Sequence, residues 1–370
     1  MPESPYLMLR PERVRENYRA LDAALIRAGR RARIRFAVKA CPVPEILRIL
    51  DTEGAQFDVA SVGEIALCLG LGIAAGQLYY GNPIKKATDI ARAHTLGVRR
   101  FAFDTEDDLL RIAEHAPGAE VECRFLSAAP PSRTPFGTKF GCAPVEALRL
   151  LVRARDLGLV VAGPYFHVGS QQLDPQAWRI GIEQAARIVE ALSDKDIAVS
   201  SVNIGGGLPV SYAEPAPGID EIAAVTIGSA VRLLPETAEL VVEPGRALVA
   251  TAGVVHAEVM GVRIAPDGRR WVYLDIGRYN GLAETENEYI AYRFATERDG
   301  DPVDEAVLAG PTCDGDDVLY QRTRVLLPTT LRAGDRVRIL DTGAYTASYS
   351  SVSFNGFAPL AVHVVGAEGE

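Results

Sequence analysis

The chain alternates between two kinds of segment over most of its length, and this alternation limits the folds that it can adopt. Short runs rich in β-branched and aromatic residues are followed by longer stretches with apolar residues at helical spacing, such as Val145–Leu157 and Gln176–Leu192. This pattern is typical of parallel strands joined by crossover helices. About eight such units in about 210 residues predict an α/β fold, a (β/α)8 barrel of the TIM type. The expected strands are Ile34–Val38, Phe57–Ala60, Leu78–Tyr80, Phe101–Phe103, Val121–Phe125, Val160–Val168, Val202–Ile204 and Leu240–Val242.

A doubly wound open sheet is the alternative that the same alternation permits. In dinucleotide-binding sheets of that kind, a Gly-x-Gly-x-x-Gly sequence follows the first strand. No such sequence follows Ile34–Val38, which favours the barrel.

The pattern changes after Gly245, where long helical stretches become scarce and turn sequences such as Pro266-Asp267-Gly268 separate short apolar runs. We therefore predict a barrel over residues 11–245 and a C-terminal β-domain over residues 246–370. The apolar run Tyr6–Leu9 predicts that residues 1–10 add a strand to the β-domain. The strands expected there are Val249–Val262, Trp271–Leu274, Ala306–Leu308, Arg336–Leu340 and Leu360–Val364.

Charge and cysteine usage exclude several classes of protein. The formal net charge of −9 and the lack of a basic patch argue against nucleic acid as the main partner. No signal peptide is visible at the N-terminus and no apolar run reaches membrane-spanning length, so no membrane partner is expected. The five cysteines have no paired spacing, which predicts reduced thiols, no metal site and a cytoplasmic protein.

Lys39 ends the first expected strand, within Arg35-Phe36-Ala37-Val38-Lys39-Ala40. A lysine partly desolvated at a strand end has a lowered pKa, and its free amine can form a Schiff base with a carbonyl compound. The alternative is a lysine whose ammonium group extends from the strand end into solvent.

Other polar groups follow the remaining strand ends, where the working residues of a (β/α)8 barrel lie. Gly205-Gly206-Gly207 can present bare N–H groups to a phosphate, and Arg246 and Ser170 can add a charge and a hydroxyl. His167 can stack on a flat ring, and Glu243 can keep a pyridine nitrogen protonated. Together with Lys39, these groups suit a phosphate-bearing pyridine aldehyde.

The ordered set of motifs resembles the fold-type III pyridoxal-phosphate decarboxylases of basic amino acids, the ornithine and diaminopimelate decarboxylase group. The resemblance covers nearly the whole chain, and the set is far more specific than any one motif. It implies an alanine racemase-like barrel, pyridoxal 5′-phosphate as cofactor and a place in polyamine biosynthesis. The motifs are Ala37–Ala40, Phe57–Ser61, Phe166–Ser170, Asn203–Gly207, Glu243–Arg246, Gly310–Gly315, Gly343–Thr346 and Phe354–Phe357.

The resemblance also implies a role for individual residues. Lys39 is the Schiff-base lysine, His167 stacks on the ring and Glu243 pairs with the pyridine nitrogen. A racemase of the same barrel type would rather have an arginine near that nitrogen, so Glu243 favours decarboxylation. Cys313 and Asp314 reach the partner's site across a homodimer interface, Cys313 as a proton donor and Asp314 as a ligand of the substrate's distal ammonium. Asp58 and Arg124 order the charges around Lys39, and the phosphate is held by Ser170, Gly206, Gly207, Gly245, Arg246 and Tyr345.

The substrate region runs from Asp275 through Tyr279 to Glu288. Glu288 falls about where ornithine decarboxylases have an aspartate for the distal amine, with Glu284 and Glu286 close by, and an acidic cluster suits a cationic side chain. Ornithine is expected first and lysine second. The sequence leaves open diaminopimelate, a pathway-specific amino acid, a solvated acidic loop without a ligand, and a regulatory homologue that has lost activity.

Overall fold

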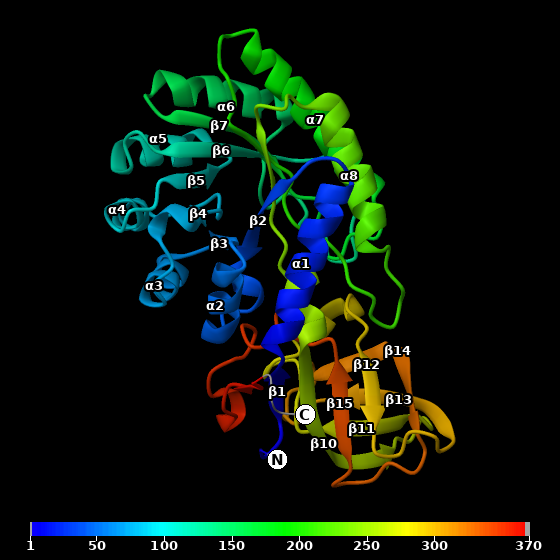
Figure 1. Cartoon of the computed structure of the whole chain (residues 1–370). Coiled ribbons are helices and arrows are strands. Elements are labelled where there is room, and N and C mark those ends of the chain that lie inside the picture. Colours follow the sequence, from blue (N-terminus) through cyan, green and yellow to red (C-terminus); the bar gives the residue numbers. More distant parts are fainter. Residues whose placement is uncertain (1, 367–370) are drawn as a thin grey trace.

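Eight parallel strands close into a barrel in the order in which they occur along the chain (Figure 1). The first strand pairs with the last as well as with the second, so the barrel has no free edge. The structure is a computed structural model that describes residues 2–366. The barrel strands are β2 (Ala32–Ala37), β3 (Gln56–Val59), β4 (Leu78–Tyr80), β5 (Arg100–Phe103), β6 (Glu120–Phe125), β7 (Val160–Phe166), β8 (Ser201–Asn203) and β9 (Glu239–Val242).

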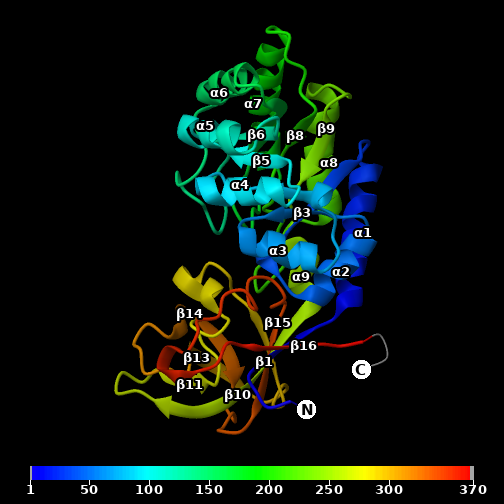
Figure 2. The same ribbon diagram turned by 90° about the vertical axis from the view of Figure 1, so that its left-hand side faces the viewer.

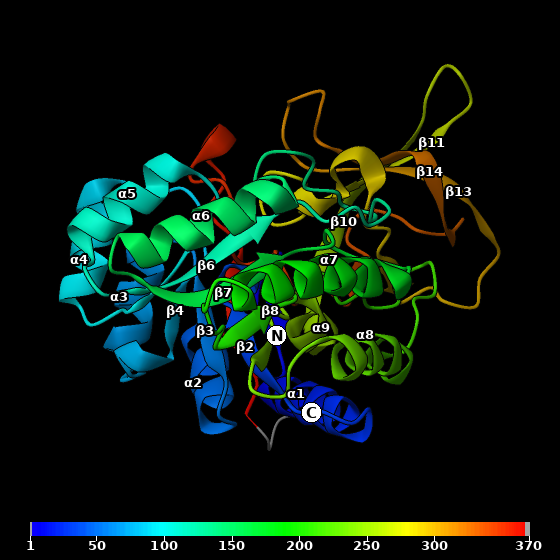
Figure 3. The same cartoon turned by 90° about the horizontal axis from the view of Figure 1, so that it is seen from above.

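Helices surround the barrel, as the view from above shows (Figure 3). Each strand is therefore covered on both faces, which explains the nearly continuous apolar runs in the sequence. Trp178 illustrates the packing, because this largest of the fully buried side chains belongs to a helix of the ring. The helices are α1 (Pro11–Arg27), α2 (Pro44–Thr52), α3 (Val62–Gly70), α4 (Ala87–Thr95), α5 (Glu106–His115), α6 (Pro144–Asp156), α7 (Gln176–Ser193) and α8 (Ile219–Leu233), with the short α9 (Arg246–Val249) after the last barrel strand.

A second sheet of eight strands forms the β-domain. Its central path runs β12-β15-β10-β11-β13-β14, and β1 joins it by pairing antiparallel with β10 and parallel with β16. The first and the last strand of the described residues thus both belong to this sheet (Figure 2). Its strands are β1 (Tyr6–Leu9), β10 (Gly253–Ile264), β11 (Arg270–Leu274), β12 (Arg293–Thr296), β13 (Val303–Ala309), β14 (Val318–Pro328), β15 (Arg336–Leu340) and β16 (Ala361–Val364).

The structure confirms the barrel and the C-terminal β-domain but corrects several boundaries. β2 ends at Ala37, and Lys39 lies in the 3-10 turn Val38–Ala40 that follows it. β7 ends at Phe166, so His167 also follows a strand rather than ending it. The predicted strand at Val249 begins only at β10, because α9 intervenes. Helix α1 and strands β12 and β14 were not predicted.

Met1 and residues 367–370, which fall in the predicted N-terminal and C-terminal segments, lie outside the described residues. Within residues 2–366, no helix has the length and apolar character needed to cross a membrane. The same residues contain no group of three or more His, Cys, Asp or Glu side chains placed to hold a metal ion.

Candidate active site

A cavity of about 430 Å³ opens where the barrel strands end. Lys39, His167 and Glu243, from three different strand ends, all line it. Of the predicted cofactor residues, only Gly206 does not contribute to the lining itself. The others that do are Asp58, Arg124, Ser170, Gly207, Gly245, Arg246 and Tyr345.

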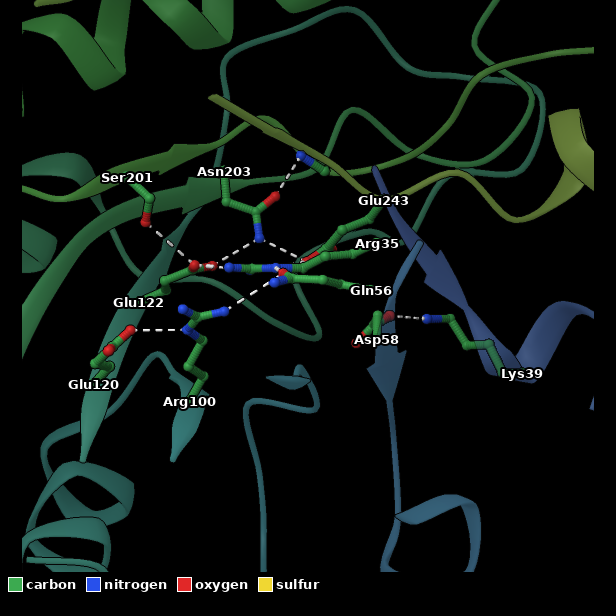
Figure 4. Close-up of polar contacts among 11 residues, drawn as sticks. Arg35, Lys39, Gln56, Asp58, Arg100, Glu120, Glu122, Ser201, Asn203 and Glu243 are labelled. Atoms are coloured by element: carbon green, nitrogen blue, oxygen red, sulfur yellow. Dashed lines mark hydrogen bonds and ion pairs between the residues drawn. The ribbon is translucent and has the colours of Figure 1, made fainter. Parts of the chain in front are cut away.

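Lys39 forms an ion pair with Asp58, with 2.8 Å between Nζ and Oδ2 (Figure 4). Parallel pairing of β2 with β3 places Ala37 opposite Asp58 and so brings the two side chains together. Burial alone would lower the pKa of Lys39, as the sequence analysis expected. The Asp58 carboxylate and the neighbouring Tyr345 outweigh burial, so the pKa is raised instead and Lys39 is an ammonium group in this arrangement.

His167 presents a neutral imidazole to the cavity. Burial, and next the positive charges of Arg124 and Lys39, lower its pKa well below the ordinary value. The backbone N–H of Gly169 donates to Nδ1 at 2.9 Å, which fixes the ring. A neutral, fixed ring can lie against a flat heteroaromatic ligand without placing a second cation beside it.

Only glycine fits the turn after β8. A Cβ atom on Gly206 would lie 2.3 Å from the carbonyl oxygen of Glu243. Gly207 has a φ of +93°, and a Cβ atom there would lie 2.3 Å from the carbonyl oxygen of Gly169. The bare backbone therefore approaches the cavity closely, as an anion-binding turn requires.

Arg246 is a buried cation that lines the same cavity as Gly207. Its guanidinium donates to Ser170 Oγ at 3.1 Å and to the hydroxyl of Tyr212 at 2.8 Å. It also donates to both carboxylate oxygens of Glu284, at 2.7 and 2.6 Å. Glu284 therefore neutralises the positive charge of Arg246, with which an anionic ligand would otherwise pair. Among the described residues Arg246 Nε, although buried, has no hydrogen-bond partner.

Glu243 lies at the floor of the cavity and is 4% exposed. Burial, and next the negative charge of Asp58, raise its pKa to about 7, while Arg35 opposes the rise. Asn203 Nδ2 donates to its Oε1 at 2.6 Å. The nearest guanidinium nitrogen, Arg35 Nη1, lies 4.0 Å from Oε1, beyond hydrogen-bond distance.

Arg124 and several residues that the sequence analysis missed complete the lining. The Arg124 guanidinium lies 5.3 to 5.9 Å from the ring centroids of Tyr165, Phe136 and Phe140, in a cation–π arrangement. Tyr165 could have been found, because it lies two residues before His167 and such positions share one side of a strand. Phe136, Lys139 and Phe140 belong to an irregular loop whose sequence carries no periodic signal.

The residues predicted to act across a dimer interface lie outside the cavity of their own chain. Cys313 is exposed, and its Sγ lies 3.3 Å from Asn355 Oδ1. The Tyr279 hydroxyl donates to Asp314 Oδ1 at 3.2 Å. Glu286 is also exposed and lies 3.6 Å from Arg278.

Glu288 does not line the cavity of its own chain either. Its carboxylate accepts hydrogen bonds from the backbone N–H groups of Gln321, Arg322 and Thr323 at 3.0, 2.8 and 2.6 Å. Although burial alone would raise the pKa of Glu288, these donors together lower it to about 2. Glu288 therefore anchors β14 to the 3-10 segment Ala283–Glu288.

Comparison with known proteins identifies the family. A family model described as the pyridoxal binding domain of pyridoxal-dependent decarboxylases matches residues 12–250. The lysine/ornithine decarboxylase of Selenomonas ruminantium is 35% identical over 358 residues, 96% of this chain and 88% of that protein. The chain belongs to the pyridoxal-dependent decarboxylases.

Solved structures of other decarboxylases have the same fold. The lysine/ornithine decarboxylase from Vibrio vulnificus complexed with cadaverine superposes with a TM-score of 0.88 at 33% identity, over 98% of this chain and 94% of that chain. The arginine decarboxylase of Paramecium bursaria Chlorella virus bound to agmatine gives 0.89 at 25% identity, over 99% and 98%. The predicted family, cofactor and reaction class are thereby confirmed.

The cavity of this decarboxylase fits pyridoxal phosphate. The neutral face of His167, the glycine turn, the unpartnered Arg246 Nε and the buried Glu243 match a flat ring, a phosphate and a pyridine nitrogen. When bound, this cofactor supplies an electron-accepting ring for the charge that a departing carboxylate leaves behind.

Replacing Glu288 by glutamine should lower the free energy of unfolding by roughly 2–3 kcal/mol at neutral pH. Because folding lowers the pKa of Glu288, the ionised carboxylate stabilises the folded protein fully above about pH 4.5. This stabilisation is lost as the pH falls towards 2. The difference between wild type and variant should therefore narrow below about pH 4.5 in urea denaturation curves. Glu286→Gln is the control, and a pH-independent difference at Glu288 would contradict the interpretation.

Proposed function

We propose that this decarboxylase converts a basic L-amino acid, ornithine in preference and lysine next, into the diamine and carbon dioxide. The observation that carries the proposal is the convergence of Lys39, His167 and Glu243 on one cavity beside an anion-binding glycine turn. The names of the relatives, lysine/ornithine decarboxylases, support this choice of substrate class.

Each residue of the cavity has a proposed part in this function. Lys39 binds the carbonyl carbon of the cofactor, and Asp58 holds its Nζ in place at 2.8 Å. His167 lies against the ring, and Glu243 keeps a proton on the pyridine nitrogen. The phosphate is bound by Arg246 and by the hydroxyl and backbone groups of Ser170, Gly206, Gly207, Gly245 and Tyr345.

Glu284 competes with the phosphate for Arg246. The two side chains are 9% and 3% exposed and form a bidentate pair, which is among the strongest ionic contacts in proteins. A phosphate can form the same two contacts only if Glu284 withdraws. Cofactor binding therefore includes the free energy of breaking this pair.

The exposed group formed by Tyr279, Cys313 and Asp314 fits a homodimer with shared sites. Asp314 would bind the distal ammonium, and Cys313 would donate the proton to the substrate carbon. Both residues lie away from the cavity of their own chain, so a second copy must supply them. The unpaired cysteines fit a cytoplasmic location.

Purified protein loaded with pyridoxal phosphate should release carbon dioxide from ornithine and lysine. Norvaline and norleucine are matched controls, since they have the same carbon chains without the distal amine. They should react at least about a hundredfold more slowly in kcat/KM, because an acidic site discriminates strongly against a ligand without the charge. Equal turnover of norleucine and lysine would contradict the proposal, and Lys39→Ala should abolish turnover.

Replacing Glu284 by glutamine should tighten the binding of pyridoxal phosphate. The neutral amide no longer neutralises Arg246, so the phosphate meets less competition. We expect the dissociation constant to fall about tenfold, which corresponds to about 1.4 kcal/mol of binding free energy. Equilibrium dialysis measures this without turnover. Glu286→Gln, in the same segment but exposed, is the matched control. Unchanged or weaker binding by Glu284→Gln would refute the competition.

Mixing two inactive proteins should restore activity if the sites are shared. After subunit exchange between Lys39→Ala and Cys313→Ala, about half of the dimers are hybrids, and each hybrid has one site without either defect. Activity should approach about a quarter of the wild-type value. Confirmed exchange without any recovery would place Lys39 and Cys313 in one site of one chain.

A further inference from the structure

Beneath Glu243, the inside of the barrel contains a buried polar network (Figure 4). Arg35 from β2, Glu122 from β6 and Asn203 from β8 are each 2% exposed or less. None of the three lines the cofactor cavity, so none meets a ligand directly. Burying a charged group raises the free energy of the folded protein unless the charge is paired. The partners of these buried groups therefore indicate their role.

The network joins Glu122 to Glu243 by two routes. Arg35 Nη1 lies 2.8 Å from Glu122 Oε1 and 4.0 Å from Glu243 Oε1. Asn203 Nδ2 donates to Glu122 Oε2 at 2.7 Å and to Glu243 Oε1 at 2.6 Å. Arg35 thus forms its close contact with Glu122 and lies beyond hydrogen-bond distance from Glu243.

The charges do not balance. One guanidinium faces two carboxylates, and the amide of Asn203 carries no charge. Because Glu122 holds the guanidinium more closely, Arg35 is only a 4.0 Å ion-pair partner of Glu243 and does not hydrogen-bond to it. Burial, and next the charge of Asp58, raise the pKa of Glu243 to about 7 despite Arg35. The groups that face Glu243 from the surrounding strands are Arg35, Asp58, Tyr79, Glu122, Tyr165 and Asn203.

We propose that Glu122 is a positioning residue that holds Arg35 beyond hydrogen-bond distance from Glu243, so that the Glu243 carboxylate remains available to hold the proton on the pyridine nitrogen. The inference rests on the proposed role of Glu243. If Glu122 were absent, Arg35 would have Glu243 as its nearest carboxylate. The guanidinium would neutralise Glu243, which would become a weaker base toward the cofactor.

A purely structural ion pair would behave differently. It would change stability when broken, but it would leave the protonation of the bound cofactor unchanged. A buried pair can also be replaced by apolar side chains of similar size with little loss of stability. Single and double replacements therefore separate the two roles.

The experiment uses protein loaded with pyridoxal phosphate that carries ¹⁵N in the pyridine ring. The ¹⁵N chemical shift reports directly whether this nitrogen is protonated. Glu122→Gln should move the shift toward the unprotonated value and lower kcat by about tenfold, with little change in KM. Arg35→Met/Glu122→Met removes the cation together with its partner, so the shift should return to the wild-type value.

Control variants keep the test decisive. Glu120, on the same strand as Glu122, forms a partly exposed pair with Arg100 of β5. Glu120→Gln breaks this pair and should change neither the shift nor kcat. If Glu122→Gln does not fold, Glu122→Asp keeps the charge but shortens the side chain, and it should produce a smaller shift in the same direction.

The results distinguish failure of this inference from failure of the proposed function. Glu243→Gln should itself move the shift to the unprotonated value, and a wild-type shift in that variant would overturn both proposals. If Glu243→Gln moves the shift while Glu122→Gln and Glu122→Asp do not, the positioning role alone is wrong. A double variant with the same shift as Glu122→Gln would likewise overturn it, because release of Arg35 would then not be the cause.

Discussion

Closure of eight parallel strands is the constraint on which the rest of this structure depends. Hydrogen bonding between β2 and β9 places Ala32 opposite Leu240, so residues about two hundred positions apart become neighbours. Because all strands run in the same direction, their C-terminal ends meet at one rim. Residues that are far apart in the sequence therefore share one cavity, because each follows a strand that ends at this rim. They include Lys39, His167, Glu243 and Arg246.

The same closure brings charged groups together inside the barrel and at its rim. Asp58 with Lys39 and Glu122 with Arg35 form pairs across neighbouring or distant strands, at 2.8 Å in each case. Glu243 lies between them, and the only contact with a cation that it makes among the described residues is the longer one with Arg35, at 4.0 Å. Burial raises the free energy of a carboxylate that has no close cation. A positively charged group bound beside Glu243 would therefore be stabilised. The protonated pyridine ring of the cofactor would be such a group, in line with the role proposed for Glu243.

The sequence predicted the barrel well because its strands are buried on both faces and read as unbroken apolar runs. It predicted β14 poorly, since the middle of Val318–Pro328 is exposed and polar and shows no alternation. The raised pKa of Lys39 could not be predicted, because it depends on the register that sets Ala37 opposite Asp58. The Arg35–Glu122 pair joins positions 87 residues apart, and neither side chain alone signals a partner. Most of the predicted cofactor residues do line the cavity, because strand ends can be located without knowing any register.

The β-domain contributes to the wall of the cavity that faces the C-terminal ends of the barrel strands. Tyr345 lines the cavity, and its backbone N–H donates to the carbonyl oxygen of Ala40 at 2.8 Å, directly beside Lys39. The Ala283–Glu288 segment brings Glu284 to Arg246, while Glu288 anchors the other end of the segment to β14. The segment that carries Glu284 is therefore tied to the edge strand of the β-sheet. The same domain carries the exposed group of Tyr279, Cys313 and Asp314, so one sheet positions both the competitor for the phosphate and the residues proposed to meet the substrate.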